Sequence, residues 1–477
     1  MDLSVSESFS FILFGASGHL ATLKLYPALY TLHLKKRVPA NFTIVGYART
    51  AMDDASFRKL VSDSIHRDHG EVNEKKIEAF LEHVHYVQGA YDSAEDFKRL
   101  TKVLEGWEAT KDAVRLAYLS IPPTVFTAVL KNLNTGGVRD GKHPFRCILE
   151  KPVGHDIKSF EAIEKELLSC FKDEEIYLLD HYLGKEALRN IYYLRFANPV
   201  LERMLKHTLI QHVEVTASEA AGIEGRARYF EHTGTFRDMV QSHLIEMCAL
   251  LTMQLIEEGE SFRESRQRAL EQFFVQPVSN PDDIILQGQY AKGGDAPAYV
   301  SEQGIEKTSR TNTFVATKLF SHAPRWEGIP FYLRSGKRLT KKETRISIQF
   351  QMPKLVTPGS TANRLDIILQ GEAGMRLHLQ TKLGGSTPQF RPLIMEDPLV
   401  CMGDCLPEHG LLLLEAIHGN HQWFLRFNEV RASWKLLDPL QAILDNKKTP
   451  LHLYPAGSGG PKEADAWMKK DGFQWLT

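Results

Sequence analysis

The first third of the chain alternates continuous apolar runs with charge-rich segments. The apolar runs occupy residues 8–15, 42–48, 115–123, 145–152 and 175–181, and the segments between them include 53–67 and 157–170. Strands that are apolar on both faces are typical of a parallel sheet that is covered by helices on both sides. The alternation therefore predicts an α/β domain with a doubly wound parallel sheet over residues 1–180.

After about residue 190 the pattern changes, and apolar and polar residues alternate one by one. This period of two occurs at 212–218, 345–352, 364–370, 376–383 and 422–427. It is typical of antiparallel strands with one covered face, and the apolar helical stretch at 234–256 could cover that face. We therefore expect a second, larger β+α domain over residues 181–477, since 477 residues are too many for one ordinary core.

Charge and cysteine content exclude several classes of function. The 58 basic and 59 acidic residues give a net charge of −1, which favours neither nucleic acid nor an anionic membrane as partner. Five cysteines are few and odd in number, which favours a reducing compartment over a disulfide framework. Cys401 and Cys405 lack a second Cys/His pair of suitable spacing nearby, so no metal site is predicted.

The N-terminus has no basic segment followed by a cleavage site, and therefore does not read as a signal peptide. No apolar run approaches the roughly 18–20 residues of a membrane span. We expect a cytoplasmic protein.

A glycine-rich turn follows the first predicted strand. Gly15 and Gly18 lie in the pattern G-x-x-G-x-x-A, ahead of a helical stretch at 20–36 that Pro27 should kink or divide. Glycines permit a tight turn and let backbone N–H groups and a helix N-terminus approach a pyrophosphate, although such turns also occur as plain connections. In this strand–turn–helix context we predict a Rossmann-type dinucleotide site, formed by Gly15, Ala16, Ser17, Gly18, His19 and Leu20.

The second predicted strand ends in Arg49. An NAD site usually has an acidic residue here, whereas an arginine suits the 2′-phosphate of NADP. The alternative is a solvated arginine on a loop. We expect NADP, with NAD possible.

A group of cations follows the predicted strand ends. The strand at 175–181 ends in Asp180 and His181, and a helix beginning near residue 183 would place Lys185 and Arg189 on one face. Ligands bind at the carboxyl ends of such strands. Lys151 also follows a strand, and residues 334–345 contain six basic residues. A phosphate ester is the expected ligand, although single lysines are mostly solvated side chains.

His243 lies in an otherwise apolar helical stretch with Asp238. A lone histidine there is more often a hydrogen-bonded core residue. A histidine that a carboxylate orients is the usual general base near neutral pH, and Asp180 is the candidate for that carboxylate.

Several stretches together resemble the glucose-6-phosphate dehydrogenase family. From about residue 10 to the C-terminus they read "GASGHLATLKLYPALYTL", "GYAR", "EKPVGHD", "DHYLGKE", "EGRARYFEHTGTFRDMVQSHL", "PFYLRSGKRLTKKETRISIQF" and "YPAGSGGP". The resemblance implies a dinucleotide-binding domain followed by a β+α domain with an open antiparallel sheet, in a homodimer or homotetramer. It implies oxidation of glucose 6-phosphate to its 1,5-lactone with transfer of hydride to NADP.

The resemblance also implies a role for each matching residue. His243 matches the general base and Asp180 the carboxylate that pairs with it. The expected substrate contacts are Lys151, His181, Lys185, Glu219, Asp238, Lys337 and Lys342. The expected cofactor contacts are residues 15–20, Arg49, Tyr118 and Lys151.

Four positions depart from the family pattern. They are His19 (usually Asp), Thr22 (often basic), Glu231 (usually Asp) and Ser242 (usually Asn). The first two bear on the choice of cofactor and Ser242 on the rate. Two alternatives stay open: a related two-domain NAD(P)-dependent sugar dehydrogenase, and a non-catalytic NADP-binding sensor.

Overall fold

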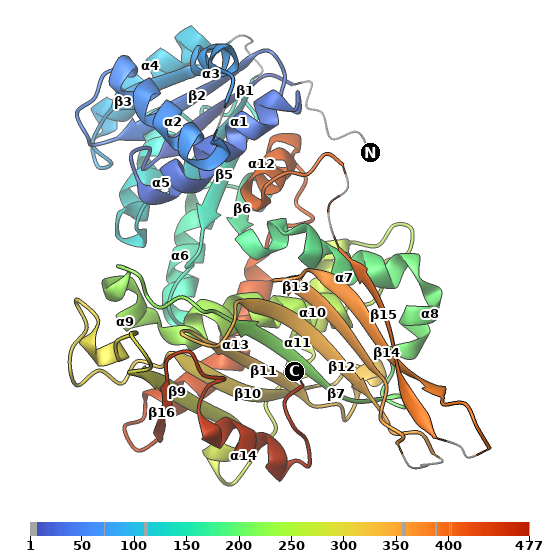
Figure 1. Cartoon of the computed structure of the whole chain (residues 1–477). Coiled ribbons are helices and arrows are strands. Elements are labelled where there is room, and N and C mark those ends of the chain that lie inside the picture. Colours follow the sequence, from blue (N-terminus) through green and yellow to red (C-terminus); the bar gives the residue numbers. More distant parts are fainter. Residues whose placement is uncertain are drawn as a thin grey trace. The chain divides into compact units, whose positions relative to one another are not determined.

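The computed structural model forms two compact units (Figure 1). The described residues are 7–70, 72–108, 113–354, 359–386, 389–399, 401 and 403–476. The first unit comprises 1–186 and 401–427, and the second comprises 187–400 and 428–477. This division differs from a single cut after residue 180, because the chain returns to the first unit at Cys401.

The first unit contains the predicted parallel sheet. Its six strands have the order β3-β2-β1-β4-β5-β6, and every neighbouring pair is parallel. The strands are β1 (Phe9–Phe14), β2 (Phe42–Ala48), β3 (Val84–Gln88), β4 (Val114–Leu119), β5 (Phe145–Glu150) and β6 (Ile176–Leu179). The sequence analysis missed β3, since this edge strand has a half-buried residue and an exposed one among its five and so does not form a continuous apolar run.

Helices connect these strands. They are η1 (Ala21–Leu25), α1 (Tyr26–Leu34), α2 (Asp54–His69), α3 (Glu74–Leu81), α4 (Ala94–Trp107), α5 (Phe126–Thr135) and α6 (Ile157–Cys170). Pro27 lies in the first turn of α1, where a proline is tolerated. The π-helical η1 passes directly into α1, so the helical stretch is not divided there. The unit also contains the short turns η2 (Pro123–Val125), η3 (Asp173–Glu175) and η4 (His181–Gly184), and helix α12 (Glu408–His418), which packs against η4.

The second unit is built on a ten-stranded sheet. Nine of its strands follow one another in the order β15-β14-β13-β12-β7-β11-β10-β9-β16, and β8 pairs with β10. They are β7 (Ile210–Ser218), β8 (Phe273–Phe274), β9 (Ile285–Ala291), β10 (Phe314–Ser321), β11 (Phe331–Gly336), β12 (Glu343–Phe350), β13 (Arg364–Gln370), β14 (Gly374–Lys382), β15 (Phe390–Pro398) and β16 (Leu451–Pro455).

Most neighbouring pairs are antiparallel, as expected, but β7–β11 and β9–β16 are parallel. The prediction of a strand at 422–427 was wrong. There Leu425 forms only an isolated bridge with Leu178 in the first unit, and α13 begins at Phe427.

The helices of the second unit are α7 (Glu186–Ala197, its first residue in the first unit), α8 (Pro199–Met204), α9 (Ala227–Thr235), α10 (Ile245–Thr252), α11 (Phe262–Glu271), α13 (Phe427–Asp445) and α14 (Lys462–Lys470). The expected helix at 234–256 consists of the π-helical segment η5 (Phe236–Leu244) followed by α10. Gly234, at φ 63°, kinks α9 one residue before its end, just ahead of η5. Because η5 packs against β7 and β11, its buried side chains lie on the sheet.

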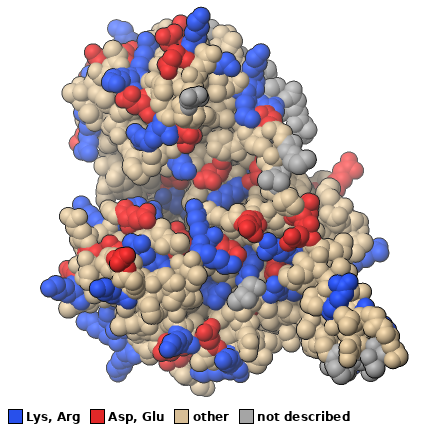
Figure 2. Space-filling model, in the orientation of Figure 1, with Lys and Arg blue, Asp and Glu red and all other residues tan. Residues whose placement is uncertain are grey.

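On the face drawn in Figure 2, basic and acidic side chains are interspersed on both units rather than gathered by sign. Among the described residues, no helix is long and apolar enough to cross a membrane. One disulfide joins Cys401 to Cys405. The sequence analysis did not foresee this bond, but it spans four positions and links no distant segments, so it is not a framework.

Candidate active site

The turn after β1 has the geometry that a dinucleotide phosphate needs. Gly15 has φ +83°, and a Cβ there would lie 2.1 Å from the carbonyl oxygen of Ser120. The Gly18 N–H donates to the Gly15 carbonyl at 2.8 Å, which closes the turn. Only glycine fits at position 15, so the backbone can approach a pyrophosphate closely. The residues present therefore fit the predicted nucleotide.

The rest of the turn is fixed by short polar contacts. Tyr26 donates to the Ala16 carbonyl at 2.7 Å, and the hydroxyls of Ser17 and Thr50 lie 3.1 Å apart. His19 is exposed and Leu20 half-buried. The Thr22 hydroxyl donates to the carbonyls of Gly18 and His19, so it stabilises the turn where a basic side chain would reach outward.

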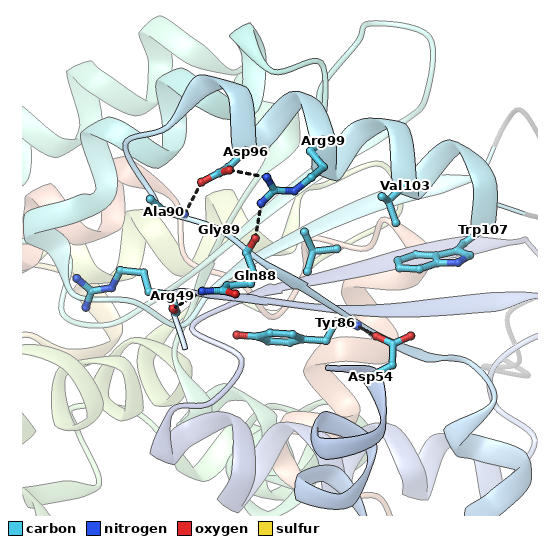
Figure 3. A pocket seen from close by; sticks show the side chains of 11 residues that line it. Arg49, Asp54, Tyr86, Gln88, Gly89, Ala90, Asp96, Arg99, Val103 and Trp107 are labelled. Carbon is cyan, nitrogen blue, oxygen red and sulfur yellow. Dashed lines mark hydrogen bonds and ion pairs between the residues drawn. The ribbon is translucent and has the colours of Figure 1, made fainter. Parts of the chain in front are cut away.

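A pocket of about 870 Å³ lies beside the ends of β2 and β3 (Figure 3). Arg49 and Arg99 both line it, but their surroundings differ. Arg99 pairs with Asp96 at 2.9 Å and donates to the Gln88 carbonyl at 2.6 Å. Arg49 is exposed and lies over the Tyr91 ring, 5.6 Å from its centroid. Among the described residues no carboxylate pairs with Arg49, so its charge is available to an anion.

Lys151 and Asp180 form an ion pair at the carboxyl ends of β5 and β6. Glu150 pairs with Leu179 in the parallel register, so the next residue of each strand comes to the same edge. Lys151 Nζ donates to Asp180 Oδ2 at 2.6 Å, and the Tyr182 N–H donates to Asp180 Oδ1 at 3.0 Å. Asp180 is 1% exposed; its buried carboxylate is therefore compensated by charge and hydrogen bonds.

Lys151 also lines a pocket of about 220 Å³ with Leu20 and Glu150. Tyr118, a predicted cofactor contact, is fully buried and donates to Glu150 Oε1. Burial, and then the adjacent Glu150, raise the pKa of Tyr118 well above its usual value. Tyr118 thus positions Glu150 and offers no exposed side-chain surface to a cofactor.

His181 and Lys185 lie on the η4 turn and just after it. The prediction that Lys185 and Arg189 share a helix was wrong, because η4 ends at Gly184 and α7 begins at Glu186. Asp180 caps η4 by accepting the Tyr182 N–H. Lys185 Nζ lies 3.7 Å from the centroid of the Tyr182 ring, and this contact orients its charge.

A second polar cluster lies in the other unit and has the same structural origin. Ser218 at the end of β7 pairs with Gly336 at the end of β11 in parallel register, which brings the following residues, Glu219 and Lys337, side by side. Lys337 Nζ donates to Glu219 Oε2 and lies 3.8 Å from Asp238 Oδ2. Lys337 is 1% exposed and pairs with two carboxylates, so its ammonium donors and their acceptor oxygens form one fixed polar group.

Asp238 and His243 come from η5. Tyr229 donates to Asp238 Oδ1 at 3.1 Å, and burial, followed by Asp238, raises the pKa of Tyr229. His243 is buried, 7% exposed, and Ser242 donates to the Asp238 carbonyl at 2.9 Å. Asp180 and His243 belong to different units, so their pairing stays a prediction.

Lys342 is exposed, one residue before β12. Within the described part of the chain, no hydrogen bond or ion pair joins it to Lys337, Glu219 or Asp238. Its role as a substrate contact stays a prediction.

Four side chains near the predicted residues were missed. They are Glu150, Tyr229, Tyr91 and His409, whose Nε2 lies 3.5 Å from Glu150 Oε1 and whose ring stacks on His181 with centroids 6.2 Å apart. Glu150 is the glutamate of the Glu-Lys-Pro stretch quoted in the sequence analysis, so the sequence could have pointed to it. Nothing in the sequence relates His409 to a strand end 259 positions earlier.

Comparisons with known proteins identify the family. The family model "Glucose-6-phosphate dehydrogenase, NAD binding domain" matches residues 12–190, and "Glucose-6-phosphate dehydrogenase, C-terminal domain" matches residues 192–476. The glucose-6-phosphate 1-dehydrogenase of Bacillus subtilis is 33% identical, over 97% of both chains. That of Chlamydia pneumoniae is 35% identical, over 97% of this chain and 95% of its own.

The fold agrees with these matches. A solved structure described as glucose-6-phosphate dehydrogenase in complex with its substrate glucose-6-phosphate superposes with a TM-score of 0.92. It is 30% identical and covers 99% of both chains. The predicted α/β domain followed by a β+α domain is therefore confirmed, and the chain belongs to the glucose-6-phosphate dehydrogenase family.

Proposed function

We propose that this protein oxidises D-glucose 6-phosphate to 6-phospho-D-glucono-1,5-lactone with NADP⁺, the first step of the oxidative pentose phosphate pathway, in the cytoplasm. One observation carries the proposal. The unit that contains His243 also holds a buried Lys337 between Glu219 and Asp238, a set of donors and acceptors that suits sugar hydroxyls.

In the proposed mechanism His243 removes the proton of the C1 hydroxyl as hydride leaves C1. Asp180 orients the imidazole and stabilises the imidazolium. A general base in this position contributes about 10²–10⁴ in rate. When bound, NADP⁺ would supply the hydride acceptor. The Gly15 turn would hold its pyrophosphate and Arg49 its 2′-phosphate, and Lys151 would contact both the cofactor and the sugar.

The phosphate of the substrate is the second recognition element. His181 and Lys185 from the η4 turn are its proposed ligands, with Lys337 and Lys342 as further substrate contacts. Binding the phosphate at a distance from C1 lets part of the binding energy orient the reacting carbon. Glucose without phosphate should therefore be a poor substrate.

A steady-state assay tests the function. We expect turnover of glucose 6-phosphate with NADP⁺, weaker turnover with NAD⁺, and kcat/KM for free glucose lower by about 10²-fold or more, since two charge-assisted phosphate contacts are absent. Equal activity on both sugars would favour the related sugar dehydrogenase.

Replacing His243 separates an enzyme from a sensor. His243→Asn should lower kcat by about 10²–10⁴-fold and leave the Kd for glucose 6-phosphate within a few-fold. Binding of NADP⁺ with no turnover by the unmodified chain would support the sensor instead.

We also propose that the chain forms a homodimer or homotetramer. Strand β15 is an edge of the ten-stranded sheet, and its Leu393, Ile394 and Met395 are 40–56% exposed. An unpaired edge with exposed apolar side chains favours association. Light scattering after size exclusion measures the mass directly, and a monomer at micromolar concentration would contradict this part of the proposal.

A further inference from the structure

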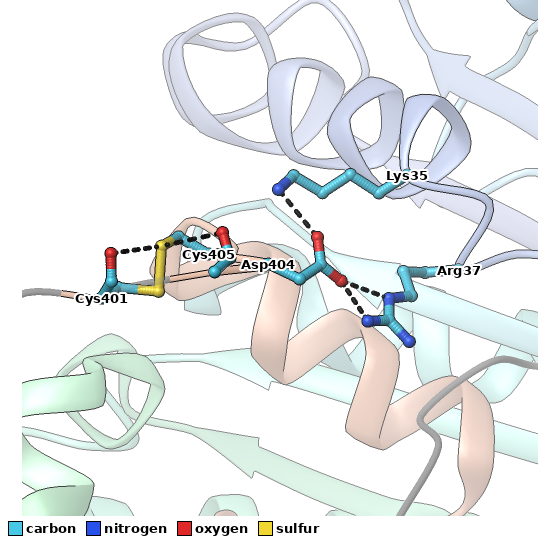
Figure 4. The surroundings of a disulfide bond; sticks show 6 residues. Lys35, Arg37, Cys401, Asp404 and Cys405 are labelled. Carbon is cyan, nitrogen blue, oxygen red and sulfur yellow. Dashed lines mark hydrogen bonds and ion pairs between the residues drawn. A yellow bond between two sulfur atoms is a disulfide. The ribbon is translucent and has the colours of Figure 1, made fainter.

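The disulfide between Cys401 and Cys405 lies just ahead of α12 in the first unit (Figure 4). Cys401 is exposed and Cys405 half-buried. Cys147 and Cys248, in contrast, are buried, and burial raises the pKa of both thiols. Thiol–disulfide exchange requires access and a thiolate. The Cys401–Cys405 pair is therefore open to a reagent that the buried cysteines exclude.

The loop that the disulfide closes contains Asp404, which forms a clamp with Lys35 and Arg37. Asp404 lies between the bonded cysteines, accepts a hydrogen bond from Lys35 Nζ at 2.8 Å and accepts another from Arg37 Nε at 2.6 Å. These hydrogen bonds, that of Lys35 first, lower the pKa of Asp404. Lys35 is the C-cap of α1. A cross-link between neighbours of Asp404 reduces the loop entropy that the clamp must overcome.

The clamp is connected through α12 to the turn that is proposed to bind phosphate. Helix α12 starts at Glu408, three residues after Cys405, and packs against η4. A Cβ at Gly184 would lie 2.3 Å from the Glu408 carbonyl oxygen, so the first turn of α12 and the end of η4 are in direct contact. The next residue of α12, His409, stacks on His181 and lies beside Glu150.

We propose that Cys401 and Cys405 form a reversible redox site that adjusts binding of the sugar phosphate, with a dithiol as reductant. A thiolate of the reductant attacks one sulfur of the disulfide and forms a mixed disulfide. Its second thiol then releases the chain, so the reductant loses two electrons and two protons and the chain gains two thiols. This inference rests on the proposed function, because the affected ligands are His181 and Lys185.

Reduction loosens the clamp, and with it the start of α12 that supports η4. A coupling at the weak end of the usual range corresponds to about a 5-fold change in affinity. We expect the Kd and the KM for glucose 6-phosphate to rise about 5-fold on reduction. The KM for NADP⁺ should change less than 2-fold. Arg49 and Tyr91, at the proposed 2′-phosphate site, lie on the segments that follow β2 and β3, and these segments carry no residue of the clamp.

The experiment uses the full chain in oxidised and dithiothreitol-reduced form. Peptide mass mapping reports the state of each cysteine, calorimetry the Kd for glucose 6-phosphate without cofactor, and steady-state kinetics the KM. The double variant C401S/C405S should have the weaker binding in both conditions. Cys170→Ser, which removes a half-buried thiol outside the loop, should respond to reduction as the unmodified chain does.

Asp404→Asn provides an independent test, since it removes the charge of the clamp and keeps both cysteines. It should weaken binding in the oxidised state by a similar factor. Free thiols at positions 401 and 405 before any dithiothreitol is added would overturn the inference. So would the same Kd with and without dithiothreitol. An absence of turnover with a redox-dependent Kd would contradict the proposed function and leave the redox site supported.

Discussion

Asp180→Asn tests the centre of the proposed mechanism. Asp180 is 1% exposed and accepts from Lys151 Nζ at 2.6 Å and from the Tyr182 N–H at 3.0 Å. Asparagine keeps the shape and the acceptor for Tyr182 but removes the charge opposite Lys151. A hydrogen bond to a charged group contributes about 1.5–3 kcal/mol, so we expect the free energy of unfolding of the first unit to fall by about 2 kcal/mol.

The kinetic effect should be larger than the loss of stability. In the proposed mechanism Asp180 orients His243 and stabilises the imidazolium, so kcat should fall by about 10²–10⁴-fold without this carboxylate. The KM for glucose 6-phosphate should change only a few-fold, because the variant retains His181 and Lys185. Denaturant titration and steady-state assays on the same preparation measure the two effects.

Asp140→Asn is the matched control. Asp140 precedes β5, at the opposite end of that strand from Lys151. Burial alone would raise its pKa, but hydrogen bonds from the backbone N–H groups of His143 and Lys142 outweigh burial and lower the pKa to about 2. The control should lose about 2 kcal/mol of stability and keep its kcat. A folded Asp180→Asn variant with kcat within 3-fold of the unmodified protein would refute the mechanism, as would an equal loss of kcat in the control.

Three further predictions follow from other sites. Arg49→Leu should raise the KM for NADP⁺ about 10–100-fold and leave that for NAD⁺ nearly unchanged, since one charge-assisted phosphate contact is lost; parallel kinetics with both cofactors measure this. Lys337→Met should lower kcat/KM for glucose 6-phosphate about 10²-fold and destabilise the second unit by about 2 kcal/mol, because two carboxylates lose their shared cation; retained kcat/KM would remove Lys337 from the site. The folded-state pKa of Asp140 lies below the unfolded value near 4, so its stabilisation is complete at neutral pH and is lost as the pH falls from about 4 to about 2; the stability difference between the unmodified protein and Asp140→Asn should vanish over that window.

The sequence predicted the elements whose burial is visible in local composition. Continuous apolar runs revealed β1 and β2, and strict alternation revealed β12 and β13. The polar residues of β12, such as Ser347, are nevertheless buried as well, so alternation identified the strand but not the number of its covered faces. Strands β3 and β16 were missed, since they are short and their residues are partly exposed. The sequence analysis also named no strand at β8, β9, β10, β11 or β15, although β9, β10 and β11 are buried along most of their length. The direction of a pairing, such as parallel β7–β11, is a property of topology that no local period encodes.

The same distinction applies to the site. Lys151 and Asp180 could be placed at one sheet edge, because residues that follow parallel strands meet there. The side chain of Lys337 could not be assigned to Glu219, since that contact depends on the unforeseen parallel register. The contact of His409 with Glu150 depends on the return of the chain to the first unit, which left no local pattern.

That return affects how the protein can be made. The first unit has a gap of about 210 residues between Glu186 and Cys401, which a ribosome translates in roughly 10–40 s. Until residues 401–427 emerge, the face of η4 that receives α12 stays uncovered. A fragment ending near residue 186 would lack this cover permanently, so the nucleotide-binding half should be expressed as two co-produced pieces or as the whole chain.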